Sequence, residues 1–448
     1  MREDTIAAIA TAPGEGAIGV VRISGPGATG IAKRIGLGSL RDRRARFAHF
    51  RDPASGAALD EGIALLMRGP RSYTGEDVVE LQGHGGSRVL RRLFEATLCA
   101  GARAAEPGEF TLRAFLNGRL DLAQAEAVLA LVQARTDVAA DLALAGLQGK
   151  LTGPLRAART AALELLAYLS ARADFPDEDV PLRDIGPELA ALGDRLERLA
   201  AEAEYGLLQR EGASIAIVGR PNAGKSSLLN RLLRQDRAIV TPVPGTTRDT
   251  LEETANLGGL RVVLTDTAGI RETTDAVERL GVERSRAAAA ASDLLLLVID
   301  ASTPLNDDDR SLLALAASAP SIAALNKLDL GALVAPGAPE LDGICALPVS
   351  ALTGEGLDAL ERELHRAIIG ERRPPASGAA LSTLRQRDAA RRALTSVRAA
   401  CEGFAAGAPE DLLSVDLAAA VRALGELTGE DATEDLLDTI FTRFCIGK

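Results

Sequence analysis

The sequence has few aromatic residues, few cysteines and no excess of positive charge. Aromatic residues make up 3% of the 448 residues, with no Trp, three Tyr and nine Phe, so a surface that stacks bases on aromatic rings is not expected. The net charge of −11 argues against an extended duplex-binding surface, because such surfaces neutralise phosphates with Lys and Arg. Any recognition of nucleic acid is therefore expected to be local or shared with a partner.

Cysteines and long apolar runs are equally scarce. Cys99, Cys345, Cys401 and Cys445 are widely spaced without a C-x-x-C pair, which favours a reducing compartment over a disulfide framework or a zinc site. The longest run of bulky apolar residues, 294–299, is far too short to span a membrane. The opening residues are too acidic for a signal peptide. We therefore expect a cytoplasmic protein that does not contact membranes.

The composition that remains is ordinary for a folded protein. Hydrophobic residues make up 47% and charged residues 25%, and the length suggests about three domains. Residues 1–119 contain 17 Lys and Arg against 13 Asp and Glu, a net charge of +4. If an anionic ligand binds outside a nucleotide pocket, this region is the better host.

Four segments with different patterns predict a multidomain protein. Residues 1–118 combine strand-like runs (18–23 and 78–81) with a helical run at 87–98, which predicts an α+β domain. Residues 119–210 and 373–448 are helical, with Asp121 as a candidate helix N-cap. The alternation across 211–372 predicts an α/β domain with strands at 214–218, 261–265, 293–299, 321–325 and 346–349. Together they predict a discontinuous helical domain with an inserted α/β domain.

A phosphate-binding loop follows the first strand of the inserted domain. Residues 219–226 match G-x-x-x-x-G-K-[ST] between a strand and an amphipathic helix. Backbone N–H groups of such a loop surround phosphates, Lys225 contacts the β/γ oxygens, and Ser226 is a Mg²⁺ ligand. The candidate nucleotide contacts in this loop are Asn222, Ala223, Gly224, Lys225, Ser226 and Ser227.

Three short motifs at later strand ends predict that the nucleotide is GTP. Asp266, which ends the second strand of this domain, would hold Mg²⁺ through water, and Gly269 would offer its backbone N–H to the γ-phosphate. Asp329 accepts two hydrogen bonds from guanine, a donor pair that adenine lacks, and a backbone N–H near residue 351 contacts guanine O6. The candidate residues are Asp266, Thr267, Ala268, Gly269, Asn326, Lys327, Asp329, Ser350 and Ala351.

The switch region differs from that of Ras-type GTPases. Residue 270 is Ile, so the glutamine that usually orients water is missing. A monovalent cation at Asn222, between β- and γ-phosphate oxygens, would supply the charge of an arginine finger. Arg248 acting as a finger in cis is the rival interpretation, although Asp249 can pair with it. The switch contributes further candidate GTP contacts, Thr241, Pro242, Val243, Pro244, Gly245, Thr246 and Thr247.

The whole chain resembles the MnmE (TrmE) family of tRNA-modifying GTPases. The resemblance is carried by the P-loop with its Asn222, the Gly-Thr-Thr-Arg-Asp switch at 245–249 and the terminal Cys-Ile-Gly-Lys at 445–448. The segments 19–25, 80–86, 107–115 and 120–127 also have the look of the family. It implies an N-terminal tetrahydrofolate-binding domain that dimerises, a split helical domain and an inserted GTPase domain.

The resemblance also implies roles for single residues of the GTPase domain. Potassium would be held by Asn222, Thr246 and the carbonyls of Thr241 and Val243, and Mg²⁺ by Ser226 and Thr247. Glu278 is similar to the family's water-activating glutamate, although without the family a solvated helix carboxylate is the plainer interpretation.

The implied folate site consists of Arg22, Glu80, Arg119 and Lys448. The folate would be a one-carbon derivative, 5-formyl- or 5,10-methylene-tetrahydrofolate. Position 119 is Arg where the family usually has Lys, which keeps the charge but changes the donor geometry. A surface-facing Arg22 and a structural salt bridge at Glu80 are the alternatives. Cys445 is a candidate for transfer or positioning near this site, or a terminal cysteine without a role.

These features favour a potassium-stimulated GTPase that helps add a carboxymethylaminomethyl or aminomethyl group at C5 of the wobble uridine of tRNA. The resemblance implies a homodimer and an FAD-dependent partner, MnmG, in a heterotetramer, and no flavin fingerprint follows a strand in this chain. A ribosome-assembly GTPase binding rRNA is the alternative, although no Gly-x-x-Gly loop follows residue 373. A membrane-remodelling GTPase is a third, disfavoured by the lack of a lipid motif.

Overall fold

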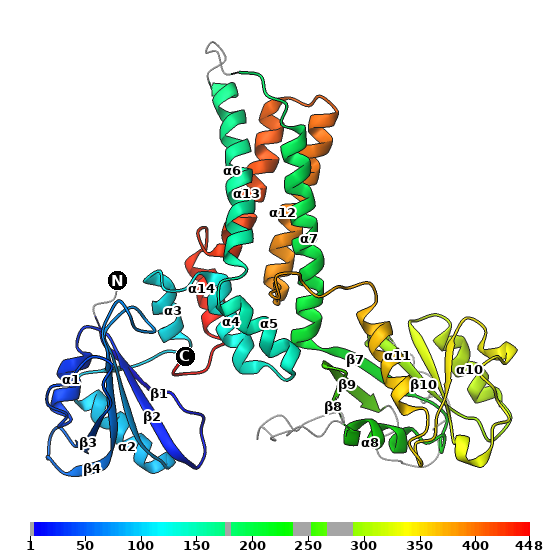
Figure 1. Cartoon of the computed structure of the whole chain (residues 1–448), viewed down its shortest axis with the longest axis horizontal. Coiled ribbons are helices and arrows are strands. Elements are labelled where there is room, and N and C mark those ends of the chain that lie inside the picture. Colours follow the sequence, from blue (N-terminus) through cyan, green and yellow to red (C-terminus); the bar gives the residue numbers. More distant parts are fainter. Residues whose placement is uncertain (1–3, 175–180, 236–251, 267–289) are drawn as a thin grey trace. The chain divides into compact units, whose positions relative to one another are not determined.

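The computed structural model describes residues 4–174, 181–235, 252–266 and 290–448 (Figure 1). These residues form two compact units. The first unit comprises Met1–Val132, Gly146–Gly193 and Arg392–Lys448, and the second comprises Gln133–Ala145 and Asp194–Arg391. The predicted multidomain fold is confirmed, with an α+β part, helical segments and an inserted α/β part. The domain limits drawn from the sequence at 118, 210 and 372 stay predictions.

A six-stranded sheet forms the α+β part of the first unit, in the order β3-β4-β5-β2-β1-β6. Its strands are β1 (Ile6–Ile9), β2 (Gly16–Ser24), β3 (Arg46–Arg51), β4 (Ala58–Met67), β5 (Val78–Gly85) and β6 (Arg103–Ala104). Neighbouring strands run antiparallel except β1 and β6, which are parallel. In the register of β2 and β5, Arg22 lies opposite Glu80.

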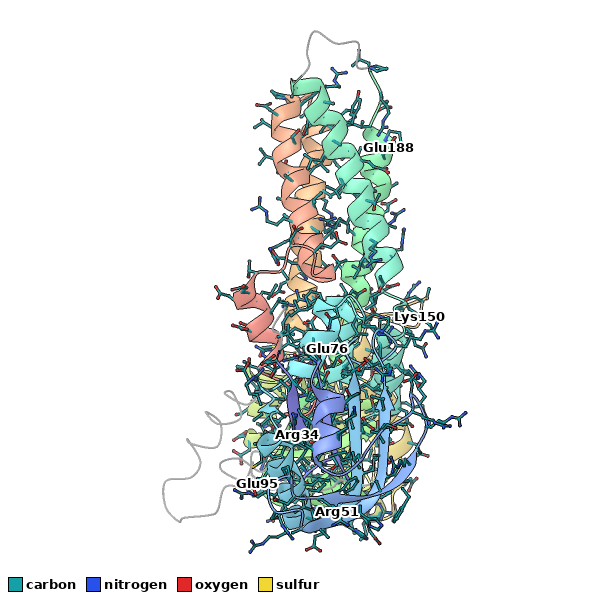
Figure 2. All side chains as sticks on the ribbon, turned by 90° about the vertical axis from the view of Figure 1, so that its left-hand side faces the viewer. Arg34, Arg51, Glu76, Glu95, Lys150 and Glu188 are labelled. Atoms are coloured by element: carbon teal, nitrogen blue, oxygen red, sulfur yellow. The ribbon has the colours of Figure 1, made fainter. Side chains whose placement is uncertain are left out.

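The two faces of this sheet differ because side chains alternate along each strand. One face packs against α1 (Ala28–Arg34) and α2 (Ser87–Cys99) through residues such as Val21 and Leu81. Arg34 joins the two helices by donating to the Ala100 carbonyl over 2.7 Å (Figure 2). Arg22 and Glu80 occupy the intervening positions and point from the other face. That face also carries the exposed side chains of Ile18, Phe47 and Ile63.

The rest of the first unit is helical. It contains α3 (Glu109–Leu116), α4 (Leu122–Gln133), α6 (Thr152–Asp174), α13 (Glu410–Thr428) and α14 (Glu434–Phe441). The helices α5 (Asp137–Leu147), α7 (Gly186–Glu211) and α12 (Leu384–Ala405) contribute residues to both units. Within the first unit, α6 packs along α13 (Figure 2). Arg172 of α6 bonds to Glu410 of α13, 238 residues further along the chain. Distant segments of the sequence therefore form one helical bundle, as the interrupted helical pattern predicts.

The second unit is built on another six-stranded sheet, in the order β12-β11-β10-β7-β9-β8. The strands are β7 (Ala213–Val218), β8 (Glu252–Leu257), β9 (Leu260–Asp266), β10 (Leu294–Asp300), β11 (Ser321–Asn326) and β12 (Cys345–Pro348). All neighbours are parallel except β8, which pairs antiparallel with β9 at the edge. The carboxyl ends of β7, β10 and β11 therefore lie at one edge, where such sheets bind ligands.

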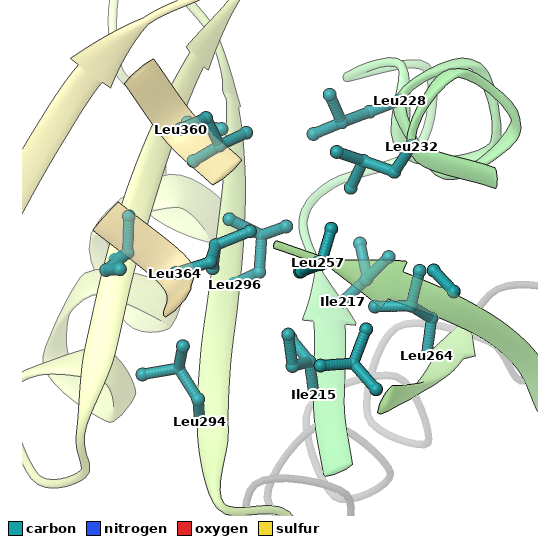
Figure 3. Close-up of a cluster of buried hydrophobic side chains, with 14 of the residues drawn as sticks. Ile215, Ile217, Leu228, Leu232, Leu257, Leu264, Leu294, Leu296, Leu360 and Leu364 are labelled. Atoms are coloured by element: carbon teal, nitrogen blue, oxygen red, sulfur yellow. The ribbon is translucent and has the colours of Figure 1, made fainter. Parts of the chain in front are cut away.

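Helices cover both faces of this sheet, which explains why its central strands are apolar throughout. Figure 3 shows the core under α8 (Lys225–Gln235) and α11 (Leu357–Ile369), where Leu228 and Leu360 face Leu296 of β10. The opposite face packs against α10 (Asp307–Ala316) through Leu312 and Leu313. The short 3₁₀ turns η1 (Leu328–Leu330) and η2 (Pro339–Leu341) follow β11. This core fixes the strand ends that carry the nucleotide motifs.

Among the residues that the structure describes, no helix is both long and apolar enough to cross a membrane.

Candidate functional site

The phosphate-binding loop lies between the end of β7 and the start of α8. Asn222 and Gly224 adopt left-handed backbone conformations, with φ of +63° and +94°. A Cβ atom on Gly224 would lie 2.2 Å from Asn326 Nδ2, so this position accepts only glycine. The Nζ of Lys225 donates to the carbonyls of Gly219 (2.7 Å) and Arg220 (2.9 Å). The loop therefore presents backbone N–H groups and the start of α8, which carries Ser226 and Ser227, to an anion.

The predicted guanine-binding residues meet beside this loop. Asn326 donates from Nδ2 to the Ala223 carbonyl over 2.9 Å, and its Oδ1 accepts from the Ala351 N–H over 3.0 Å. The hydroxyl of Ser350 donates to Asp329. The structure thus brings together all three described motifs of the predicted GTP site. The Ala351 N–H, expected to contact guanine O6, is held by Asn326 in this structure.

Lys327 of the guanine motif makes a contact with Asp300 that the sequence does not indicate. Its backbone φ is +67°, and its ammonium donates to Asp300 Oδ2 over 2.7 Å. Burial raises the pKa of Asp300, but hydrogen bonds from Lys327 and Ser302 outweigh that effect and hold the pKa below its ordinary value. Sequence reasoning missed Asp300, because it belongs to none of the recognised motifs and only marks the end of an apolar strand.

In the first unit, Arg22 is the centre of the candidate folate site. Its Nε donates to Glu80 Oε1 over 3.0 Å, and its NH1 donates to the Gly447 carbonyl over 3.3 Å. The guanidinium lies 5.6 Å and 5.8 Å from the ring centroids of Tyr73 and Phe110, close enough for cation–π attraction. Two predicted residues and the segment next to Lys448 therefore lie together on the sheet face opposite α1 and α2, which Phe110 of α3 and Tyr73 partly cover. Tyr73 and Phe110 were not predicted, since neither lies in a recognisable pattern with Arg22.

The other predicted residues of this region lie around that centre. Arg119 donates from Nε to the Ser72 carbonyl over 3.1 Å, so it contacts the loop that carries Tyr73. The backbone N–H of Lys448 donates to the Cys445 carbonyl over 3.2 Å, in a turn at Gly447 with φ of +96°. The side chain of Cys445 is exposed. The structure therefore places the tail against the sheet with the thiol open to solvent.

A network of charged side chains around the buried Arg113 lies next to the candidate folate site. Arg113, with 8% of its side chain exposed, pairs with Asp4, Glu76 and Glu109. Glu76, labelled in Figure 2, also accepts a hydrogen bond from the Ser24 hydroxyl over 2.7 Å. Because Arg113 has three acidic partners, its buried charge is compensated. The network links α3 to the loop before β5 and so holds Tyr73 in place.

The family models and the curated relatives agree. The model of the GTP-binding protein TrmE N-terminus matches residues 5–119, and that of the MnmE helical domain matches residues 122–445. A tRNA modification GTPase MnmE of Roseiflexus castenholzii is 52% identical over 465 residues, all of this chain and all of its own. The chain belongs to the MnmE family. The MnmE of Chloroflexus aurantiacus is also 52% identical, over 99% of this chain and 100% of its own, and that of Symbiobacterium thermophilum is 49% identical over both full lengths.

Several residues that the MnmE resemblance singles out lie outside the described residues. Asp266 is described only as the last residue of β9, in register with Ile217 of β7. The candidates outside the described ranges are Glu278, the switch residues Thr241, Pro242, Val243, Pro244, Gly245, Thr246 and Thr247, and the motif residues Thr267, Ala268 and Gly269. Of the residues that the resemblance implies as potassium ligands, the structure therefore describes only Asn222.

Proposed function

We propose that this chain is a potassium-stimulated GTPase of tRNA modification. With an FAD-dependent partner it adds a carboxymethylaminomethyl or aminomethyl group to C5 of the wobble uridine, using a one-carbon tetrahydrofolate. The coarser part, GTP hydrolysis in tRNA modification, follows from full-length identity of 45–52% to relatives named tRNA modification GTPase MnmE. The single observation that carries the proposal is this full-length match, combined with a P-loop and guanine motifs that meet at one edge of the second sheet.

The residues present fit GTP and its metal ions. Gly224 and Asn326 pack so closely that a Cβ atom at position 224 would clash with the Asn326 side chain. The left-handed Asn222 stands in the loop itself, so its side-chain oxygen is available to a monovalent cation. Potassium would be held by Asn222, Thr246 and the carbonyls of Thr241 and Val243, and Mg²⁺ by Ser226 and Thr247. The cation would supply positive charge where the transferred phosphoryl group develops negative charge, and Glu278 would orient water.

The face of the first sheet opposite α1 and α2 fits a folate. A pterin offers adjacent donors and acceptors, and Glu80 and the backbone of the tail offer complementary groups. Tyr73 and Phe110 give the site an apolar wall, and burial raises the pKa of the Tyr73 phenol, so this hydroxyl stays neutral. Arg119 and Lys448 would supply positive charge for the anionic glutamate of the folate. Cys445 lies next to this site and would position the one-carbon group or the tail.

The same face supports the proposed homodimer. Ile18 and Phe47 are each 64% exposed and Ile63 is 42% exposed, although they lie on a sheet whose other face is covered. Exposed apolar side chains that cluster on a sheet face favour association. The proposed assembly is a homodimer through residues 1–118 joined to two copies of the partner MnmG.

Nucleoside composition of bulk tRNA tests the function directly. A strain lacking this gene should lose the C5 modification of wobble uridine, and the wild-type gene should restore it. Lys225→Ala should fail to restore it because the phosphates lose their buried cation, whereas the exposed-helix variant Asp308→Asn should restore it. Intact wobble modification in the deletion strain would contradict the proposal and favour the ribosome-assembly alternative.

Replacing NaCl by KCl at equal ionic strength tests the cation site. GTP turnover should rise on the order of 10²-fold in KCl, the scale expected for one charge at the transition state. Asn222→Ala should remove most of the difference between the two salts. Equal turnover of the wild-type protein in both salts would remove potassium from the proposal while leaving GTP hydrolysis intact.

A further inference from the structure

Asp300 is a buried carboxylate at the edge of the sheet that carries the nucleotide motifs. It ends β10, lies in register with Asn326 of β11, and its side chain is 9% exposed. Its Oδ2 accepts from Lys327 Nζ over 2.7 Å, and its Oδ1 accepts from the backbone N–H and the hydroxyl of Ser302 over 3.1 Å and 2.6 Å. These bonds fix the carboxylate in one orientation.

A second cation approaches the same carboxylate from the phosphate-binding loop. The guanidinium of Arg220 lies 3.7 Å from Asp300 Oδ2, and its Nε lies 3.7 Å from Asp309 Oδ1. Arg220 also donates to the Thr303 hydroxyl. The side chain of Asp309 is 2% exposed, and this residue closes the capping box at the start of α10, so Arg220 is held on both sides by groups that cannot move freely.

The contacts form one chain from the base motif to the phosphate motif. Lys327 belongs to the guanine motif and Arg220 to the P-loop, and Asp300 lies between them. The carbonyl of Arg220 in turn accepts from the phosphate-binding Lys225 over 2.9 Å. We propose that Asp300 is a positioning residue that holds Lys327 against the guanine pocket and links it to the P-loop, and so sets the affinity for guanine nucleotides.

The backbone of Lys327 explains why such a restraint is needed. A non-glycine residue with φ of +67° is uncommon and strained, and the side chain of Lys327 is 29% exposed. A long, partly exposed side chain samples many rotamers unless its end is fixed. The 2.7 Å bond to Asp300 fixes it, because a bond between two charged groups is short and strong.

Nucleotide affinity measured by fluorescent GDP titration tests this role on the full chain. Asp300→Asn should weaken GDP binding about 10-fold, the effect of losing one charge-assisted hydrogen bond. Lys327→Met should weaken it at least as much. The double variant should bind GDP no more weakly than Lys327→Met alone, because Asp300 acts through that lysine. Asp308→Asn, an exposed carboxylate in the first turn of α10, is the matched control and should bind like the wild type.

Two results would overturn the assignment. One is an Asp300→Asn variant that keeps wild-type GDP affinity. The other is a double variant whose loss equals the product of the two single losses, which indicates a general structural role for Asp300 instead. If Asp300→Asn does not fold, Ser302→Ala provides the second measurement: it frees the carboxylate but leaves its charge, and should weaken GDP binding by a smaller factor that also disappears in the Lys327→Met background. Unchanged binding in Ser302→Ala would count against the proposal.

Discussion

At the scale of single residues, His84 shows how a buried carboxylate can fix an exposed side chain. Its Nδ1 lies 2.7 Å from Asp60 Oδ1, and its backbone N–H donates to Asp60 Oδ2 over 2.8 Å. The His84 side chain is 70% exposed, whereas that of Asp60 is 8% exposed. The hydrogen bond and the charge of Asp60 raise the pKa of His84. Burial raises the pKa of Asp60, but hydrogen bonds from His84 and from the backbone N–H of Glu61 outweigh this effect and hold the pKa below its ordinary value.

The signs of these two shifts predict a pH window. The stability that protonated His84 contributes is fully present at a pH below 6.5, its ordinary pKa, and is lost as the pH rises through the raised pKa of the folded protein. The stability that ionised Asp60 contributes is fully present at a pH above 3.8, its ordinary pKa, and is lost as the pH falls through the lowered pKa of the folded protein. In an NMR titration, His84 should therefore titrate above pH 6.5 in the wild type and at a lower pH in Asp60→Asn than in the wild type. Glu95→Gln on α2 is the control and should leave the titration unchanged. A His84 that titrates normally in the wild type would contradict the pairing.

The residues that sequence could predict are those whose chemistry is local. Lys225 and Ser226 stand next to each other in a loop whose backbone dictates the site, so a short pattern suffices. Asp300 and Tyr73 act through partners on other strands, and no spacing in the sequence reveals such contacts. Arg22 and Glu80 are intermediate, because the family resemblance implied both as folate-site residues and the antiparallel register places them opposite each other.

At the scale of elements, helix starts and buried strands were predicted best. Asp121 is a helix N-cap, as predicted: its Oδ1 accepts from the Gln124 N–H over 2.8 Å, and Gln124 Oε1 accepts from the Asp121 N–H over 3.0 Å. The central strands β7, β10 and β11 were found within one residue at each end, since both faces are buried and their sequences are continuously apolar.

The edge strand β12 (Cys345–Pro348) was predicted within one residue at 346–349, whereas β8, β3 and β4 were missed for the opposite reason. β8 lies at the edge of the second sheet, and of its residues Ala255 and Leu257 are buried, which leaves too short an alternation to recognise. β3 and β4 carry charged residues and Phe47 on an exposed face. Their pattern becomes regular only once the uncovered side of the sheet is known.

At the scale of the whole molecule, the chain returns at residue 447 to the sheet where it began. Gly447 has φ of +96°, and a Cβ atom there would lie 2.6 Å from the Ile9 carbonyl oxygen. Only glycine can therefore occupy position 447 in this conformation, in which the residue 447 carbonyl accepts the hydrogen bond from Arg22. The interruption of the helical domain could be predicted from the repeated helical pattern. The return of the tail was implied only by the family resemblance, which put Lys448 at one site with Arg22, because no pattern in the tail itself indicates its destination.

Gly447→Ala tests whether the C-terminal tail contributes to the proposed folate site, and it leaves the sequence of the GTPase domain unchanged. On the proposed folate site, this variant should bind 5-formyltetrahydrofolate at least about 10-fold more weakly in calorimetry, as the tail shifts away and Arg22 loses an acceptor. GTP affinity should stay at the wild-type value. Ile446→Ala, at an exposed neighbouring position, is the control and should bind both ligands normally. Normal folate binding by Gly447→Ala would show that the tail is not part of the site.

The distance of 425 positions between Arg22 and Gly447 has a consequence for biosynthesis. Arg22 leaves the ribosome early and can pair with Glu80 once β2 and β5 have both been made. The entire nucleotide-binding unit is translated after that. The Gly447 carbonyl exists only after all of these residues have been made. A chain that stops short of residue 447 still contains the sequence of the sheet and of the P-loop, but it lacks the carbonyl to which Arg22 donates.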